Sequence, residues 1–256
     1  MKQLWSLLLL LVIAGCGGSV DSPQAPVEKG NPSKMEKPAK VVSSGIVGVV
    51  RGKITFTGEV PERQPISMAA DAVCAARYQD DVALTENLLV GSDQSVANVF
   101  VYIKSGLEGQ TFKVPSQPVV LDQDGCRYHP HVLGLQAGQP LQIINSDSTL
   151  HNVHSLAENQ RQFNLGMPIP NMRTTKKFDV PEVMVKLKCD VHPWMHAYIG
   201  VVAHPFFAVT SADGTFEIGD LPVGTYTVAV WHEELGAEEQ QIEVSEASPR
   251  VANFVF

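Results

Sequence analysis

Three residues that bind soft metals lie within one short segment of the chain. They are Cys189, His192 and Met195, and they offer a thiolate, an imidazole and a thioether. A distorted copper site uses one cysteine and two histidines in a plane, with a distant methionine on the axis. The segment therefore supplies three of these four groups, and a second histidine must come from elsewhere in the chain.

The candidate for the second histidine is His151. It follows an apolar run, 140–144, that predicts a strand, so we expect His151 just past the end of that strand. A Cys-x-x-His pattern alone is weak, because zinc sites and chance also produce it. A single cysteine or methionine is more often a core residue. The combination of all four residues is what favours copper and electron transfer.

The residues around His151 and the segment 189–195 resemble the cupredoxins, a family of small blue copper proteins. In that family the first histidine ligand is followed by asparagine, here Asn152, and the other ligands share one later loop. The loop spacing resembles that of the amicyanins, with Trp194 in place of a phenylalanine. The resemblance covers roughly residues 112–203. It implies one type 1 copper ion bound by His151, Cys189, His192 and Met195.

The same resemblance implies roles for two neighbours of the ligands. Asn152 would hydrogen-bond across to the loop of Cys189 and hold the two ligand-bearing segments together. Trp194 would form an apolar docking surface beside an exposed edge of His192, although a core tryptophan is an equal interpretation. We expect an electron carrier rather than an enzyme, because no residue that would orient Cys189 and His192 as nucleophile and base can be named.

The chain is acidic, with 256 residues and a formal net charge of −8. This charge argues against nucleic acid as a partner and favours a redox protein with a basic docking surface. With 44% hydrophobic residues, the chain can bury one large core or two small ones.

The first fifteen residues predict a signal peptide, because one positive charge precedes an apolar run that is too short to span a bilayer. The segment ending at Cys16 resembles the lipobox of bacterial lipoproteins, which implies a lipid anchor on Cys16. An ordinary signal peptide is the alternative. Residues 16–44 are then the anchor and a flexible tether. Gly17 implies sorting to the outer membrane, so we expect the protein on its periplasmic side or at the cell surface.

Export also constrains the cysteines, because disulfides form in oxidising compartments. If Cys16 carries lipid and Cys189 binds copper, Cys74 and Cys126 are the pair left for a disulfide. The alternative is two separate buried thiols.

Short runs rich in valine, isoleucine, phenylalanine and tyrosine alternate with turn residues, which predicts an all-β protein. The expected strands include 140–145, 176–180 and 224–232. Only Met68–Tyr78 is plausibly helical. The turns after residue 208 resemble those of the carboxypeptidase regulatory-like domain, a small transthyretin-like β-sandwich. We therefore expect a cupredoxin Greek-key sandwich, 107–205, inserted into a smaller sandwich formed by 45–106 and 206–256.

Other interpretations remain open. The histidines outnumber the copper ligands, so His131 and His154 could form an auxiliary metal site, although hydrogen-bonding or surface roles are simpler. Cys126 and His129 could join Cys189 and His192 in a structural zinc site, which would make the chain a non-redox binding module. A copper carrier or buffer would use the same ligands as an electron carrier and would release the metal readily.

Overall fold

The computed structural model describes residues 40–41, 45–246 and 249–256. The predicted signal peptide, Cys16 and nearly all of the predicted tether lie outside these residues. Strands form nearly all of the regular secondary structure in the described residues, and only one short helix occurs there, so the prediction of an all-β fold is confirmed. No helix within them is long and apolar enough to cross a membrane.

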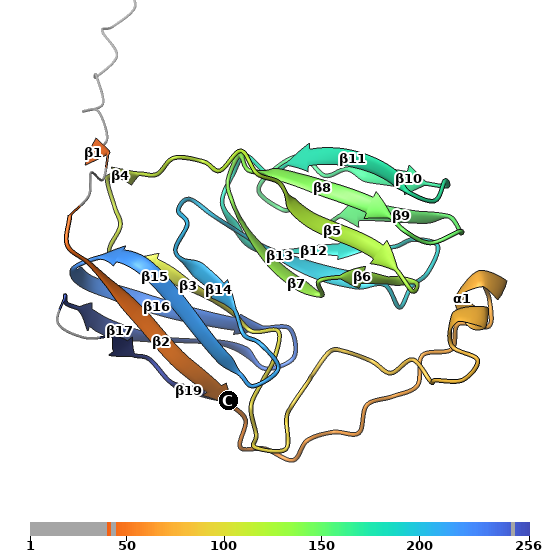
Figure 1. Ribbon diagram of the computed structural model, residues 1–256, viewed down its shortest axis with the longest axis horizontal. Coiled ribbons are helices and arrows are strands. Elements are labelled where there is room, and N and C mark those ends of the chain that lie inside the picture. Colours follow the sequence, from red (N-terminus) through yellow and green to blue (C-terminus); the bar gives the residue numbers. More distant parts are fainter. Residues whose placement is uncertain (1–39, 42–44, 247–248) are drawn as a thin grey trace, which may run out of the picture. The chain divides into compact units, whose positions relative to one another are not determined.

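One β-sandwich is built from the central part of the chain (Figure 1). Its first sheet has the order β10 (Asn164–Met167), β9 (His151–Ser155), β12 (Glu182–Lys188), β13 (His196–Val202) and β7 (Val132–Gln136). Its second sheet has the order β11 (Met172–Lys177), β8 (Pro140–Asn145), β5 (Val119–Asp124) and β6 (Arg127–His129). Apolar side chains from both sheets, such as Leu141 and Leu187, share one buried cluster, which is what joins the two layers.

A second β-sandwich uses strands from both sides of the first in the sequence. One sheet has the order β14 (Phe207–Val209), β3 (Phe100–Ser105), β16 (Gly224–His232) and β17 (Gly236–Val244). The other has β15 (Thr215–Pro222), β2 (Val47–Thr55) and β18 (Arg250–Val251), and β19 (Phe254–Val255) also pairs with β2. Along β15, buried and exposed residues mostly alternate, as expected for a sheet with one face in the core. The chain leaves this sandwich after β3 and re-enters it at β14, and these two strands are paired.

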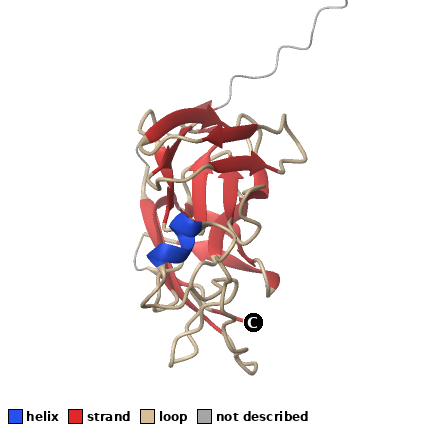
Figure 2. Cartoon of the chain, turned by 90° about the vertical axis from the view of Figure 1, so that its right-hand side faces the viewer, coloured by secondary structure: helices blue, strands red, loops and turns tan. Residues whose placement is uncertain are grey.

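The segment 57–95 between β2 and β3 forms a long excursion that carries the only α-helix of the described residues, α1 (Ala72–Arg77) (Figures 1 and 2). Asp71 begins the helix, since its carboxylate accepts hydrogen bonds from the backbone N–H groups of Val73 (2.8 Å) and Cys74 (3.1 Å). Cys74 is bonded to Cys126, which links α1 to the first sandwich at the turn between β5 and β6. A short strand β1 (Lys40–Val41) pairs in parallel with β4 (Gln110–Thr111).

Several strands of the first sandwich were not predicted from the sequence. They are β6, β7, β9 and β10, and the strand expected at 176–180 lies earlier, as β11. The reason is clearest for β9, whose residues are mainly polar although four of the five are buried. Most of their polar side chains have hydrogen-bond partners, although the buried Ser155 hydroxyl has none. A strand of polar residues lacks the alternating apolar pattern, so hydrophobic periodicity does not reveal it.

Candidate metal centre

Two segments at one end of the first sandwich bring the predicted ligands together. His151 is the first residue of β9 rather than a residue of the preceding loop. The other three residues lie on the connection from β12 to β13. This connection is closed by backbone hydrogen bonds from Cys189 N–H to the Met195 carbonyl (3.0 Å) and from Met195 N–H to the His192 carbonyl (2.9 Å).

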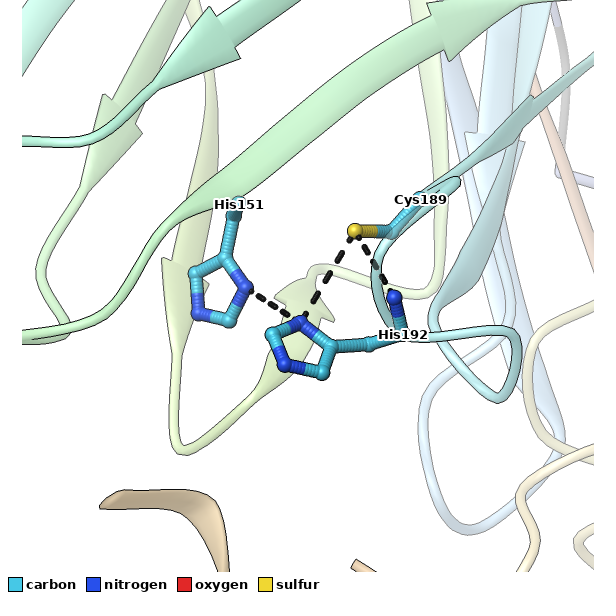
Figure 3. A group of neighbouring side chains, drawn as sticks. All are labelled: His151, Cys189 and His192. Atoms are coloured by element: carbon cyan, nitrogen blue, oxygen red, sulfur yellow. Dashed lines mark hydrogen bonds between the residues drawn. The ribbon is translucent and has the colours of Figure 1, made fainter. Parts of the chain in front are cut away.

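His151, Cys189 and His192 converge on one small volume (Figure 3). Their ligand atoms all lie within 4.8 Å of one another. The two Nδ1 atoms are 2.9 Å apart, and the Cys189 sulfur is 3.9 Å from Nδ1 of His192. The three residues are at most 2% exposed. Two imidazole nitrogens and one sulfur therefore face one another away from water.

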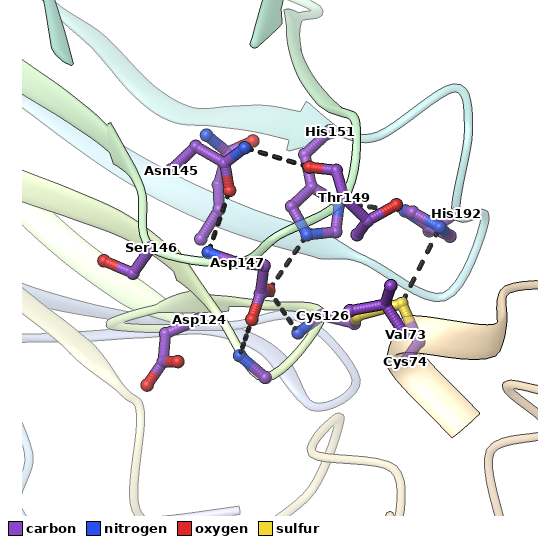
Figure 4. A network of polar contacts seen from close by, with 12 residues as sticks. Val73, Cys74, Asp124, Cys126, Asn145, Ser146, Asp147, Thr149, His151 and His192 are labelled. Atoms are coloured by element: carbon purple, nitrogen blue, oxygen red, sulfur yellow. Dashed lines mark hydrogen bonds and ion pairs between the residues drawn. A yellow bond between two sulfur atoms is a disulfide. The ribbon is translucent and has the colours of Figure 1, made fainter. Parts of the chain in front are cut away.

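The outer nitrogen of each imidazole is held by a carboxylate, as Figure 4 shows for His151 and Asp147. Nε2 of His151 is 2.9 Å from Asp147, and Nε2 of His192 is 3.2 Å from Asp71. A carboxylate at this position favours the tautomer with the proton on Nε2, which leaves the Nδ1 lone pair free. Both free lone pairs then point into the volume shared with Cys189.

Asp147 is itself fixed in place. Its two oxygens accept hydrogen bonds from the backbone N–H groups of Gly125 (2.9 Å) and Cys126 (2.7 Å), and the amide oxygen of Asn145 accepts from its N–H (3.1 Å). An anchored carboxylate holds the His151 ring in one orientation, which is the usual arrangement around a histidine that binds metal.

The charges of the three residues suit a cation. Burial raises the pKa of the Cys189 thiol, but its contacts with His151 and with backbone N–H groups outweigh burial and lower it. Burial lowers the pKa of His151, but its contacts with Asp147 and Cys189 raise it to about 9. Burial lowers the pKa of His192. The contacts around Cys189 therefore make its ionisation easier than that of a free thiol, and a metal cation binds the ionised sulfur.

Asn152 links the two ligand-bearing segments. Its side-chain oxygen accepts hydrogen bonds from the Asp190 N–H (2.7 Å) and the Cys189 thiol (3.2 Å). Its amide nitrogen donates to Asn164 on the neighbouring strand (2.7 Å). The expected bond from Asn152 to the Cys189 loop is thus present in its contact with the Asp190 N–H, and this bond ties the loop to β9.

Met195 is 1% exposed and packs in the same hydrophobic cluster as Cys189. The backbone hydrogen bonds of the loop hold the main chain of Met195 beside Cys189 and His192. Its role as the axial ligand stays a prediction.

The expectation of an exposed His192 edge is wrong, because His192 is 2% exposed. Asp71 lies against its Nε2, and the Cys74 sulfur is 3.8 Å from the same atom. The Trp194 indole N–H donates to the Cys126 carbonyl (3.0 Å), and its ring centre is 5.0 Å from that of His192. The segment that carries α1 therefore covers the ligand edge that was expected to face a partner.

Asp71 and Asp147 are the residues that the sequence prediction missed. Asp147 had a local signal, since it precedes His151 by four residues in a polar turn after β8. Asp71 had only the signal of a helix N-cap ahead of Ala72, and nothing in the sequence relates it to a histidine 121 positions later.

The structure does not assemble the other metal sites considered from the sequence. Cys126 is bonded to Cys74 and His129 is exposed, so the four zinc ligands are not available together. His131 and His154 also lie in different surroundings. His131 contacts Glu233, whereas His154 is 3.0 Å from Asp190 beside the candidate copper loop.

Comparisons with known proteins give partial structural likenesses only. No protein-family model and no curated protein sequence matches the chain. A copper-containing nitrite reductase from Thermus scotoductus SA-01 is 19% identical over 39% of this chain and 25% of its own, with a TM-score of 0.32. This chain thus spans about a quarter of that protein's length.

Two smaller proteins are matched over nearly their whole length. A purple cupredoxin from Nitrosopumilus maritimus is 22% identical over 32% of this chain and 97% of its own, with a TM-score of 0.28. The Cu(I) form of an amicyanin variant is 22% identical over 40% of this chain and 97% of its own, with a TM-score of 0.30. Likenesses at these TM-scores are too partial to define a family for this chain.

Proposed function

We propose that this protein binds one copper ion through His151, Cys189, His192 and Met195 and carries single electrons between redox proteins. One observation carries the proposal: two imidazole Nδ1 atoms and a cysteine sulfur converge in a buried volume, and both outer nitrogens are held by carboxylates. Copper supplies a one-electron couple, and thiolate, imidazole and thioether groups are the donors that suit it.

The residues around the ligands would keep the site stiff during electron transfer. Asp147 and Asp71 hold the imidazole rings, and Asn152 holds the loop of Cys189 through the Asp190 N–H. Ligands that cannot move keep nearly the same geometry in both oxidation states, so little rearrangement accompanies a one-electron step. This stiffness supports a carrier of electrons over a protein whose purpose is to give up its metal.

The cellular setting belongs to the same proposal. The lipobox-like segment ending at Cys16 supports an anchor in the bacterial envelope, and residues 16–44 would give the sandwiches reach from the membrane. The net charge of −8 supports partners with basic docking surfaces.

The test is to load the full chain with Cu(II) and record its visible and electron paramagnetic resonance spectra. We expect an intense blue charge-transfer band and narrow copper hyperfine splitting. Cys189→Ser should abolish the band because the band arises from the thiolate, and His151→Asn should weaken copper binding. His129→Asn is the matched control, since His129 is exposed and should leave both properties unchanged. A colourless copper-loaded protein would contradict the proposal.

A copper buffer would differ in how fast it gives up the metal. Because the ligands are at most 2% exposed, we expect slow release of copper to a chelator and fast electron exchange with a small redox partner. Rapid release with slow electron exchange would favour the buffer.

A further inference from the structure

A second group of potential ligands lies directly after the candidate copper loop. It consists of His131, His196 and Glu233, which we call the Glu233 site. His131 immediately precedes β7, and His196 is the first residue of β13. Glu233 lies on the turn between β16 and β17, so it belongs to the other sandwich. The site therefore draws its side chains from both sandwiches.

The two histidines direct the same ring atom at one carboxylate. Nε2 of His131 bonds to one oxygen of Glu233, and Nε2 of His196 is 3.1 Å from the other. The ligand atoms of all three residues lie within 4.8 Å of one another. The side chains of His131 and Glu233 are 8% and 5% exposed, and that of His196 is 19% exposed. Two nitrogens and one carboxylate thus share a volume that is mostly shielded from water.

The hydrogen bond of the other ring nitrogen of His196 favours a positive charge between His196 and Glu233. Its Nδ1 lies 3.3 Å from the carbonyl oxygen of Trp194, so Nδ1 carries a proton and donates it to that oxygen. In the neutral ring, Nε2 then presents a lone pair to the Glu233 carboxylate. A lone pair and an anion repel unless a positive charge lies between them. A backbone carbonyl on the outer nitrogen is also a common partner of histidines that bind metal.

The site has room for an additional ligand. A cavity of about 190 Å³ is lined by His131 and His196 together with Trp194 and Tyr128. Two histidines and one carboxylate, with a position left for water or a small anion, form a donor set used by zinc and other divalent transition ions. Because the set contains no sulfur, it does not share the preference of the Cys189 site for Cu(I).

We propose that His131, His196 and Glu233 bind a divalent transition ion, with Zn²⁺ as the representative probe, and that this ion ties the two sandwiches together. The proposal is independent of copper at the first site, because the two sites share no ligand. The competing explanation is an ion pair in which a protonated histidine supplies the positive charge.

The experiment is a Zn²⁺ titration of the copper-loaded full chain, followed by calorimetry and by elemental analysis after desalting. We expect one zinc ion per chain with the copper retained, and a rise in the melting temperature as zinc is added, because a ligand that binds the folded state stabilises it. Glu233→Gln and His196→Gln should each weaken zinc binding more than about 100-fold, since losing a group that merely supports a ligand already costs about 10- to 100-fold.

Matched controls separate a lost ligand from a damaged fold. Glu234→Gln changes the adjacent carboxylate, which bonds to Asn87 instead, and His129→Asn changes an exposed histidine two residues from His131. Both should bind zinc like the unaltered chain. Circular dichroism of the Glu233→Gln variant should show an intact fold.

The results of the zinc titration test the Glu233 site and do not depend on the proposed copper site. If the copper-loaded chain takes up no zinc, or if Glu233→Gln and His196→Gln both leave its affinity unchanged, the Glu233 site is an ion pair and the proposal fails. If the first site proves not to bind copper, the same titration in the Cys189→Ser variant still reports on the Glu233 site. Co²⁺ then gives a further check, because it should produce weak visible bands without a thiolate charge-transfer band.

Discussion

Replacing Cys74 and Cys126 together by alanine removes the covalent link that holds α1 against His192. The two cysteines are separated by 52 positions, and the loop-closure relation for a disulfide then gives about 4 kcal/mol at 25 °C. We expect the free energy of unfolding to fall by roughly this amount. The double replacement is preferable to a single one, because replacing one cysteine would leave the other as a free thiol near the candidate copper site.

The assay is urea unfolding of the oxidised chain followed both by tryptophan fluorescence and by circular dichroism. Val73→Ala is the matched control, because Val73 lies on the same helix, is 41% exposed and should change stability by no more than about 0.5 kcal/mol. A loss below about 1 kcal/mol in the double variant would refute the reasoning. It would mean that the link neither restricts the unfolded chain nor supports the folded one.

The same variant tests whether α1 covers the metal centre. Asp71 still accepts a hydrogen bond from Thr149 (2.7 Å), and Tyr78 still donates to the Gly125 carbonyl (2.9 Å), so the segment should stay attached but open more often. We expect a chelator to remove copper faster from this variant than from the unaltered chain. Equal rates would show that the disulfide does not limit access to His192.

Three further changes have separate expected outcomes. Asp147→Asn should weaken copper binding about 10- to 100-fold in a chelator competition, and an unchanged affinity would show that this carboxylate does not support the ligand. Burial lowers the pKa of His204 below its ordinary 6.5, so the unfolded chain takes up a proton that the folded chain refuses as the pH falls through 6.5. His204 should therefore contribute a loss of stability between pH 7.5 and 5.5. The free energy of unfolding of the His204→Gln variant, measured by urea unfolding, should lose less over this range than that of the unaltered chain, and an equal loss would contradict this reasoning. Gly200→Ala would place a Cβ 2.2 Å from the buried ring of Phe100 and should cost about 1 to 3 kcal/mol, whereas Gly166→Ala, with no atom nearby, should unfold like the unaltered chain.

The sequence predicted the elements whose patterns are local. The strands 140–145 and 224–232 are found where apolar periodicity places them, since each combines a turn with a run of alternating or continuous apolar residues. The segment 189–195 was also recognisable, because three of the predicted ligands lie within seven consecutive residues. A short segment carries its own spacing and needs no knowledge of the rest of the fold.

The parts that escaped prediction depend on contacts between distant residues. Strand β9 is polar, and its burial is explained only by partners such as Asp147 and Asn164 on other elements. Asp71 reaches His192 because a disulfide and a short helix bring it there. Glu233 meets His131 across two sandwiches. In each case the pairing is a property of the tertiary structure, which a single sequence does not encode in any local pattern.

The pairing of β2 has a consequence for how the chain acquires its structure. Arg51 on β2 contacts Glu217 on β15, and the two residues are 166 positions apart. Contacts of such long range form slowly, because the loop between them must first be closed. The strands between residues 119 and 202 pair only with one another, so their pairing does not wait for the last strands of the chain. Until the last strands are available, β2 has unpaired edges that are prone to aggregation, so a chaperone that binds extended strands should be needed most by this early segment.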